Sequence, residues 1–422
     1  MARATFEEIR LPPASHADAH APRSARFPQF VGLPADADRR LDGLRVAIVG
    51  AGSVGRSLVV HASRLMVSIL WIIDPGRFKP TSFLTYPHLL PGEELHESKA
   101  VSAGRLAKRL SPETRVWVFD GGVEALPETA FADADFILLA TDQLSAEVET
   151  GQRCAHLGTR LIHASVHGPT LVAQVRCLAN RHHERPRPCL ACGYTRQERA
   201  SLDQQIRFSC EGAQTGRTVA ESRTAPTMSV SFLCAAAADL AMMQLIKWAL
   251  HLGPAPDDTL LEYAGYTHRA TISPLVRDPN CPCDHAVFQP ASSPRPTLEE
   301  CSLSELIEAA GFNGAAGETL LTVGDDLAFA ESAQCACGRS VRVGRFVPTA
   351  AGPVEPIERC ACGGAFQVHR FYAHRPAPAS VVEAVRNRPL RELGAASVDW
   401  VLVRQGDRPV LFRSGCDGRE SP

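Results

Sequence analysis

Short apolar runs recur along the first half of the chain, and stretches with helical periodicity separate them. The apolar runs predict buried strands at 44–49, 69–73, 116–119, 136–140, 161–164 and 171–175, and the periodic stretches predict helices at 57–65, 99–110 and 145–157. Strands that are apolar on both faces and alternate with helices are typical of parallel sheets covered by helices on both sides. The sequence therefore predicts an α/β fold with a Rossmann-like, doubly wound and mainly parallel sheet.

The remaining segments divide the 422-residue chain into an arm and two domains. Residues 1–43, rich in Pro, Ala, Asp and Arg, form an N-terminal arm, and residues 44–288 form the main domain. The proline-rich stretch 289–296 predicts a linker, and residues 297–422 predict a small separate domain. Within the main domain, 227–252 predicts an apolar helix, and its Ser, Asp and Gln residues indicate buried core rather than a membrane span.

Composition and charge narrow the class of protein. Apolar residues make up 45% of the chain and charged residues 21%, and the formal net charge is −2. This balance excludes a global electrostatic attraction to nucleic acid or to an anionic membrane as the basis of the main interaction. The first 28 residues mix charges and prolines without an apolar segment, which is not the pattern of a secretory signal, so we expect a cytoplasmic protein.

A glycine motif connects the first predicted strand to the first predicted helix. The segment Gly50-Ala-Gly-Ser-Val-Gly55 fits GxGxxG in the strand–turn–helix context that gives this motif meaning, with Gly50, Gly52, Ser53 and Gly55 as nucleotide-binding candidates. Asp74 ends the second strand, where a carboxylate can bind a ribose hydroxyl. The motif predicts adenine-nucleotide binding but does not by itself distinguish NAD from ATP. No hydride-transfer site is recognisable in the rest of the sequence.

The fourteen cysteines indicate metal binding rather than disulfides, because we expect a cytoplasmic chain. Eight fall into close pairs, and two pairs together supply the four thiolates of a closed structural Zn²⁺ site. The first predicted set is Cys189, Cys192, Cys281 and Cys283, and the second is Cys335, Cys337, Cys360 and Cys362. Glycines after the second set's pairs and strands predicted at 340–343 and 366–369 indicate a zinc-ribbon-like domain, and another strand is predicted at 397–403. The cysteines predicted to have no role are Cys154, Cys177, Cys234 and Cys301.

Several motifs occur in an order that resembles one known family. Besides the glycine loop, Asp74 and the first two cysteine pairs, they are the arm segment Arg23-Ser-Ala-Arg26, Lys99 at the start of a helix, and Thr141-Asp142 after a strand. Over roughly two-thirds of its length the chain resembles the ThiF/MoeB/HesA adenylating enzymes, bacterial relatives of ubiquitin-activating enzyme. The resemblance implies ATP-dependent adenylation of the C-terminus of a ubiquitin-like protein.

The resemblance also implies roles for individual residues. Asp142 would hold Mg²⁺, Lys99 would approach the ATP phosphates, and Arg26 would act across a homodimer on the partner's ATP. Cys210, in the polar crossover stretch 179–225, would receive the activated protein as a thioester and pass it to a conjugating partner. The C-terminal domain would dock the modifier or a carrier. Some bacterial relatives with extra C-terminal modules belong to conjugation operons tied to phage defence.

The chain departs from the family pattern beside the ribose acid. Gly76, Ser82 and Thr85 stand where the family has an acid, an asparagine and an arginine, and Arg77 or Lys79 are candidates to compensate. These departures motivate the alternative of a nucleotide-binding scaffold without activity. Another alternative is activation of a sulfur carrier, or adenylation of a peptide, with Cys210 dispensable. An NAD-dependent oxidoreductase is a more distant reading, tested by nucleotide preference.

Overall fold

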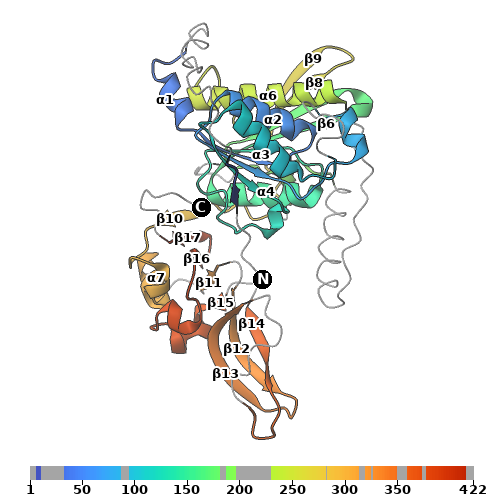
Figure 1. The fold of residues 1–422 in the computed structure, drawn as a ribbon. Coiled ribbons are helices and arrows are strands. Elements are labelled where there is room, and N and C mark those ends of the chain that lie inside the picture. Colours follow the sequence, from blue (N-terminus) through green and yellow to red (C-terminus); the bar gives the residue numbers. More distant parts are fainter. Residues whose placement is uncertain are drawn as a thin grey trace. The chain divides into compact units, whose positions relative to one another are not determined.

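The structure is a computed structural model, and it describes residues 6–10, 33–86, 95–180, 187–195, 230–281, 283–312, 319–324, 327–348, 359–372 and 377–414. The chain divides into two compact units (Figure 1). The larger spans Ala4–His285, and the smaller contains the residues from Ala286 onward.

A nine-stranded sheet forms the centre of the larger unit, in the order β1-β4-β3-β2-β5-β6-β7-β8-β9. Its parallel part consists of β4 (Arg115–Phe119), β3 (Ile69–Ile73), β2 (Arg45–Val49), β5 (Phe136–Leu139) and β6 (Arg160–His167). Antiparallel strands extend it at both ends, namely β1 (Glu7–Glu8), β7 (Val172–Leu178), β8 (Thr259–Ala264) and β9 (Arg269–Pro274). The predicted parallel sheet is therefore confirmed for its centre, and the prediction missed β1, β8 and β9.

Helices cover both faces of this sheet, as the doubly wound prediction requires (Figure 1). One face carries α1 (Ala37–Asp42), α2 (Ser53–Arg64), α3 (Lys99–Leu110) and α6 (Ser231–Leu250), which share one apolar core with it. The opposite face carries α4 (Leu144–Leu157) and the short helix η5 (Leu190–Gly193) over a second core. The other short helices of this unit are η2 (Pro80–Leu84), η3 (Val123–Ala125) and η4 (Gly168–Thr170).

The apolar helix α6 is the one described helix that is long and apolar enough to cross a membrane by composition alone. Half of the tested stretch is buried inside the protein, where α6 packs against α2, β6 and β7. Cys234 lies in this contact and is buried, as expected for a core cysteine. The packing confirms the prediction that this segment is a core helix.

The smaller unit contains two sheets rather than a single zinc ribbon. One has the strand order β10-β17-β16-β11-β15, and the other has β13-β12-β14. The strands are β10 (Gln289–Ala291), β11 (Thr319–Val323), β12 (Leu327–Cys335), β13 (Ser340–Pro348), β14 (Phe366–Tyr372), β15 (Ala377–Pro378), β16 (Trp400–Gln405) and β17 (Arg408–Arg413). The helices are η6 (Leu298–Glu300), α7 (Leu303–Ala309), α8 (Ala379–Val382), η7 (Glu383–Val385) and η8 (Leu390–Leu393).

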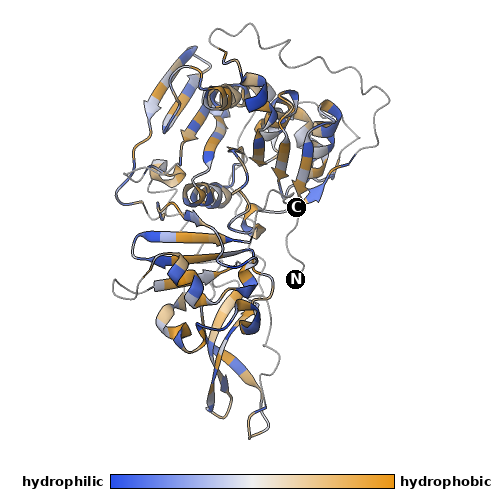
Figure 2. Ribbon diagram, turned by 90° about the vertical axis from the view of Figure 1, so that its left-hand side faces the viewer, coloured by the Kyte–Doolittle hydropathy of each residue, from blue (hydrophilic) through white to orange (hydrophobic). Residues whose placement is uncertain are grey.

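Two expectations for this region need correction. The predicted linker 289–296 begins with β10, which pairs in parallel with β17 and so belongs to the smaller unit. The three-stranded sheet contains the predicted strands 340–343 and 366–369, as β13 and β14, and also β12, which was not predicted. The predicted strand 397–403 overlaps β16 in the five-stranded sheet, which forms a further core with α7. Figure 2 shows apolar residues along the strands of both units. The smaller unit therefore has an apolar core of its own and does not depend on metal alone for burial.

Candidate functional site

The carboxyl ends of four neighbouring parallel strands form one pocket in the larger unit. Its lining comes from the residues after β2, β3, β4 and β5, together with the first residue of α3. The lining residues are Val49, Gly50, Ile73, Asp74, Pro75, Gly76, Lys99, Gly122, Val123, Glu124, Thr141, Asp142, Gln143 and Ala146. Loops after parallel strands meet at the same edge of the sheet, so residues far apart in sequence converge there.

The glycine loop between β2 and α2 has little room for side chains. Gly50 has a φ of +93°, and a Cβ there would lie 2.5 Å from the carbonyl oxygen of Ala140. A Cβ on Gly55 would lie 1.8 Å from the carbonyl oxygen of Gly50. Gly52 is the N-cap of α2 and supplies no side chain to cap the helix. The first backbone N–H groups of α2 therefore point out of the helix N-terminus, where anions are favoured.

Asp74 fixes the glycine loop against the next loop. Its Oδ2 accepts a 2.6 Å hydrogen bond from the backbone N–H of Ala51, and its Oδ1 accepts one of 2.6 Å from Gly76. A Cβ on Gly76 would lie 2.8 Å from Asp74 Oδ1 and 3.1 Å from Lys99 Nζ. The space in which the resemblance places a second acid is thus already occupied by these two side chains.

Lys99 is the first residue of α3, and its ammonium group reaches the same pocket. Ser98 caps the helix by accepting a hydrogen bond from Val101. Burial acts to lower the pKa of Lys99, but Tyr86 and the carboxylates of Asp74 and Asp142 outweigh it and raise the pKa above its ordinary value. The ammonium is therefore held charged beside two acids, where a bound polyphosphate would meet it.

Asp142 follows β5 and lines this pocket together with Asp74 and Lys99. Both acids thus lie on one side of the sheet, as the nucleotide hypothesis requires. Arg77, a candidate to compensate for the missing groups, is not among the residues that line this pocket, and it forms a 2.7 Å ion pair with Asp120. Glu124 and Gln143 also line the pocket and were not predicted, since no motif marks the loop after β4 and Gln143 lies one residue beyond the Thr141-Asp142 motif.

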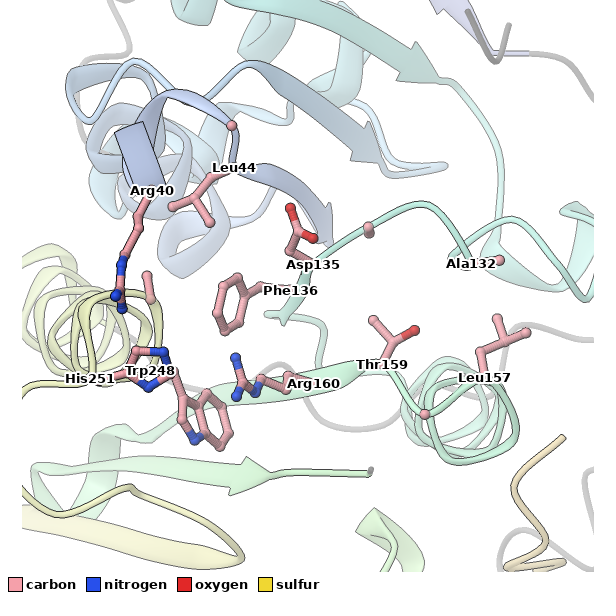
Figure 3. Close-up of a pocket in the computed structure, with 14 residues that line it drawn as sticks. Arg40, Leu44, Ala132, Asp135, Phe136, Leu157, Thr159, Arg160, Trp248 and His251 are labelled. Carbon is pink, nitrogen blue, oxygen red and sulfur yellow. The ribbon is translucent and has the colours of Figure 1, made fainter. Parts of the chain in front are cut away.

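A second cavity lies at the opposite, amino edge of the same sheet (Figure 3). It is about 610 Å³, against about 190 Å³ for the pocket at the carboxyl edge. The guanidinium of Arg160 lies 5.5 Å from the ring centres of both Phe136 and Trp248. Arg40, which also lines it, forms a 3.0 Å ion pair with Asp36. The larger volume carries none of the predicted nucleotide-binding residues, so we assign the function to the smaller pocket.

The first cysteine set is brought together with one change of partner. The ligand atoms of Cys189, Cys192, Cys281 and His285 all lie within 4.8 Å of one another. Cys189 Sγ is 3.6 Å from Cys281 Sγ, and Cys192 Sγ is 3.2 Å from His285 Nε2. The compact set thus includes His285 in place of the predicted Cys283. His285 was not predicted, because the spacing of paired cysteines alone defined the expected ligands.

Cys283 nevertheless lies beside this cluster. The hydrogen bond with Cys192 lowers the pKa of Cys189, but the hydrogen bond with Cys283, burial and the other thiols outweigh it and raise the pKa to about 12. Four thiols and an imidazole lie close together here, so a thiolate that forms among them is poorly stabilised, and a bound cation would reverse this. Four of these five donors would make a tetrahedral Zn²⁺ site of the usual ligand types.

The second cysteine set is gathered as predicted, with Cys335, Cys337, Cys360 and Cys362 all within 4.8 Å of one another. The two pairs form matching turns in which Gly338 donates 2.8 Å to the carbonyl of Cys335 and Gly363 donates 2.8 Å to that of Cys360. Both glycines have positive φ, at +87° and +84°. Such turns present two sulfurs on one side, which suits a tetrahedral metal ion.

Two predicted site residues, Arg26 and Cys210, lie outside the described residues. The core prediction holds for the other single cysteines, since Cys154, Cys177 and Cys301 are buried. Burial raises the pKa of Cys154, and it raises that of Cys177 to about 12. Neither thiol is ionised near neutral pH, so neither is suited to act as a nucleophile.

A buried polar cluster lies under the carboxyl edge, between β6 and α4. His163 is 1% exposed, and its Nε2 is 3.7 Å from Glu147 Oε1. Tyr194, two residues after Cys192, donates a 2.9 Å hydrogen bond to Glu147 Oε2. Burial, aided by Arg176, lowers the pKa of His163 to about 3. The histidine is therefore neutral at physiological pH.

Residues 24–283 match the ThiF family. E. coli MccB with ATP is similar at 15% identity over 58% of this chain and 68% of that chain, with a TM-score of 0.45. PaaA is similar at 15% identity over 57% and 75%, with a TM-score of 0.42. Among curated proteins no relative matches. Since the family match covers more than half of the 422 residues, the chain belongs to the ThiF family.

Proposed function

We propose that this protein uses ATP to adenylate the C-terminal carboxylate of a ubiquitin-like protein. ThiF family members are adenylating enzymes. The observation that carries the proposal is the single pocket in which the glycine loop, Asp74, Lys99 and Asp142 meet. An adenylating enzyme needs these groups on the same side of the sheet, and this pocket supplies them.

The reaction converts a poor electrophile into a reactive one. A carboxylate oxygen of the substrate attacks the α-phosphorus of ATP, the bond to the bridging oxygen breaks, and pyrophosphate leaves with the electron pair. Asp74 binds the ribose and the N-terminus of α2 faces the phosphates. Lys99 stabilises the negative charge that develops on pyrophosphate. Asp142 would hold a Mg²⁺ ion, whose chemistry is to neutralise phosphate charge.

Two further roles in the proposal belong to residues outside the described part of the chain. Cys210 would attack the acyl adenylate, releasing AMP and forming a thioester, and a conjugating partner would then accept the modifier. Arg26 would complete the site of a second subunit in a homodimer. The smaller unit, with its own core, would serve as the docking domain.

The decisive experiment measures ATP–pyrophosphate exchange with a ubiquitin-like protein that ends in a free glycine. Exchange should require the free C-terminal carboxylate and should persist in Cys210→Ala, while a reducing-agent-sensitive adduct should form only with Cys210 present. Exchange with no adduct would favour activation of a sulfur carrier or of a peptide. No exchange with any modifier encoded nearby would overturn the proposal and favour a nucleotide-binding scaffold, a reading that Gly76 and Thr85 motivate.

We further propose that both cysteine clusters hold structural Zn²⁺, with His285 completing the first. Its support is the 3.2 Å distance between His285 Nε2 and Cys192 Sγ. Elemental analysis of purified protein should find two zinc ions per chain. His285→Ala should lower the content of the first site, and Cys283→Ser is the matched control. If only Cys283→Ser releases zinc, then Cys283 is the ligand and His285 is not.

A further inference from the structure

Two residues after the end of η2, Tyr86 brings an aromatic side chain close to the glycine loop. Tyr86 ends the described segment 33–86, and its ring packs edge-on against Phe78 at 5.4 Å between ring centres and 84° between planes. Phe78 is fully buried, and the guanidinium of buried Arg56 lies 5.6 Å from its ring centre. Tyr86 is therefore fixed from below by packed side chains rather than held by solvent-exposed contacts.

The hydroxyl end of Tyr86 lies between the glycine loop and Lys99. A Cβ built on Gly52 would lie 3.6 Å from the phenolic oxygen. Lys99 Nζ lies 5.4 Å from the ring centre. Tyr86 acts to raise the pKa of Lys99, and Lys99 acts to lower the pKa of Tyr86 against the larger effect of burial. The phenol thus lies beside the N-terminus of α2 and the ammonium group at the same time.

A lysine needs such a restraint if its charge is to act at one point. Its four-carbon side chain loses up to about 2 kcal/mol of rotamer entropy when it is fixed. Asp74 and Asp142 both act on the ammonium of Lys99, and a third contact would restrict it further. A phenol held by Phe78 supplies that contact from the side of the glycine loop, where the phosphates of a bound nucleotide would lie.

We propose that Tyr86 is a positioning residue that holds the Lys99 ammonium over the glycine loop, ready to meet the leaving pyrophosphate. This inference rests on the proposed adenylation and adds to it a residue that no motif predicted. Tyr86 acts through Lys99, so removing its hydroxyl matters only while the lysine is present. The role of Tyr86 should therefore matter for ATP but not for AMP, because AMP has no pyrophosphate for Lys99 to bind.

A double-mutant cycle tests the proposal. Tyr86→Phe keeps the ring and its packing on Phe78 but removes the polar oxygen beside the ammonium, and we expect it to lower ATP–pyrophosphate exchange about tenfold, the size of effect that losing a polar contact with a charged group has. In a Lys99→Ala background the same change should have no further effect. Affinity for Mg-ATP should fall in Tyr86→Phe, while affinity for AMP stays as in wild type. Tyr263→Phe, which removes a tyrosine hydroxyl from the β8–β9 hairpin, is the matched control.

A second measurement does not depend on catalysis. Trace acetylation of the nucleotide-free protein by acetic anhydride, followed by peptide mass spectrometry, reports the reactivity of Lys99. Without the phenol the amine is less restrained, so Lys99 should be acetylated faster in Tyr86→Phe than in wild type or Tyr263→Phe. Equal labelling of Lys99 in Tyr86→Phe and wild type would overturn the inference. So would a Tyr86→Phe effect on exchange that is as large in the Lys99→Ala background as in wild type. If wild type shows no exchange and binds no ATP, the proposed function fails, and the labelling still decides whether Tyr86 holds the lysine.

Discussion

The two edges of one sheet differ in a way that cavity size does not reveal. The amino edge has the larger cavity, but its cations are already engaged, Arg160 between two rings and Arg40 with Asp36 (Figure 3). The carboxyl edge has the smaller pocket, yet it collects the glycine loop, Asp74, Lys99 and Asp142. The comparison teaches that the direction of the strands, rather than the volume enclosed, decides where an anionic ligand can bind.

The physical reason lies in the helix termini. Each parallel strand ends at the carboxyl edge, and the following helix begins there, so unpaired N–H groups and positive dipole ends face that edge. The amino edge receives helix C-termini, such as the end of α6 at His251, whose exposed carbonyls repel phosphate. The predictions below test this contrast by altering matched residues at the two edges.

The largest effect is expected from glycines. Gly55→Ala would place its Cβ 1.8 Å from the Gly50 carbonyl oxygen, so we expect loss of ATP binding and a lower free energy of unfolding, by about 2–3 kcal/mol. Gly43→Ala at the amino edge adds a Cβ 3.7 Å from its nearest neighbour and should be close to neutral. Urea denaturation and calorimetric ATP titration measure both variants. Equal destabilisation by Gly55→Ala and Gly43→Ala would contradict the proposed difference between the two edges.

The second largest effect is expected from a change of Asp142. Asp142→Asn keeps the side-chain shape but removes the charge that would hold Mg²⁺, so exchange should fall at least about a hundredfold. The protein should stay folded, with its melting temperature little changed, because Asp142 is exposed. Measuring exchange over a range of magnesium concentrations provides the readout. Wild-type activity in Asp142→Asn would remove the main support for the carboxyl-edge site.

His163 should make the carboxyl side of the larger unit sensitive to acid. With its pKa lowered to about 3, it stays neutral in the folded protein, whereas the unfolded chain takes up a proton below about pH 6.5. Stability should therefore fall as pH drops from 6.5 towards 3, by at most about 1.4 kcal/mol per pH unit from this group. Urea unfolding at pH 7 and pH 5 should show a smaller loss in His163→Gln. If the free energy of unfolding fell by the same amount in His163→Gln as in wild type, the lowered pKa of His163 would be contradicted.

The smallest effect is expected at the amino edge. Arg160→Met keeps an unbranched side chain but removes the charge between Phe136 and Trp248, which should lower stability by about 1 kcal/mol. ATP affinity and exchange should remain those of wild type, because the site is at the other edge. A loss of nucleotide binding in this variant would show that the amino-edge cavity takes part in it.

Much of the central sheet could be read from the sequence, and its margins could not. The predicted strand 69–73 and helix 99–110 match β3 and α3 to the residue, because their apolar patterns are long and buried. The helix after the glycine loop begins at Ser53, four residues earlier than predicted, because Gly52 serves as its N-cap. Strand β9 is exposed along its whole length, so no apolar pattern marks it, and pairing with β8 alone defines it.

The site divides in the same way. The spacing of motifs identified Asp74, Lys99 and Asp142 as candidates, and the fold brings them to one pocket. Spacing could not choose between Cys283 and His285, since both follow Cys281 within four residues and only the folded loop decides which atom faces Cys192. Tyr86 carries no motif, and its meaning depends on the ring of Phe78 and the reach of Lys99.

By itself the sequence determined the alternation of strands and helices in the centre of the larger unit, the glycine turn and the kinds of ligand atoms available, because these follow from local pattern and residue chemistry. The tertiary structure alone decided that Gly76 makes room for Lys99 and that Tyr86 approaches that lysine. Contacts between residues distant in sequence depend on strand register and helix packing, and a difference of one residue in either would point these side chains elsewhere.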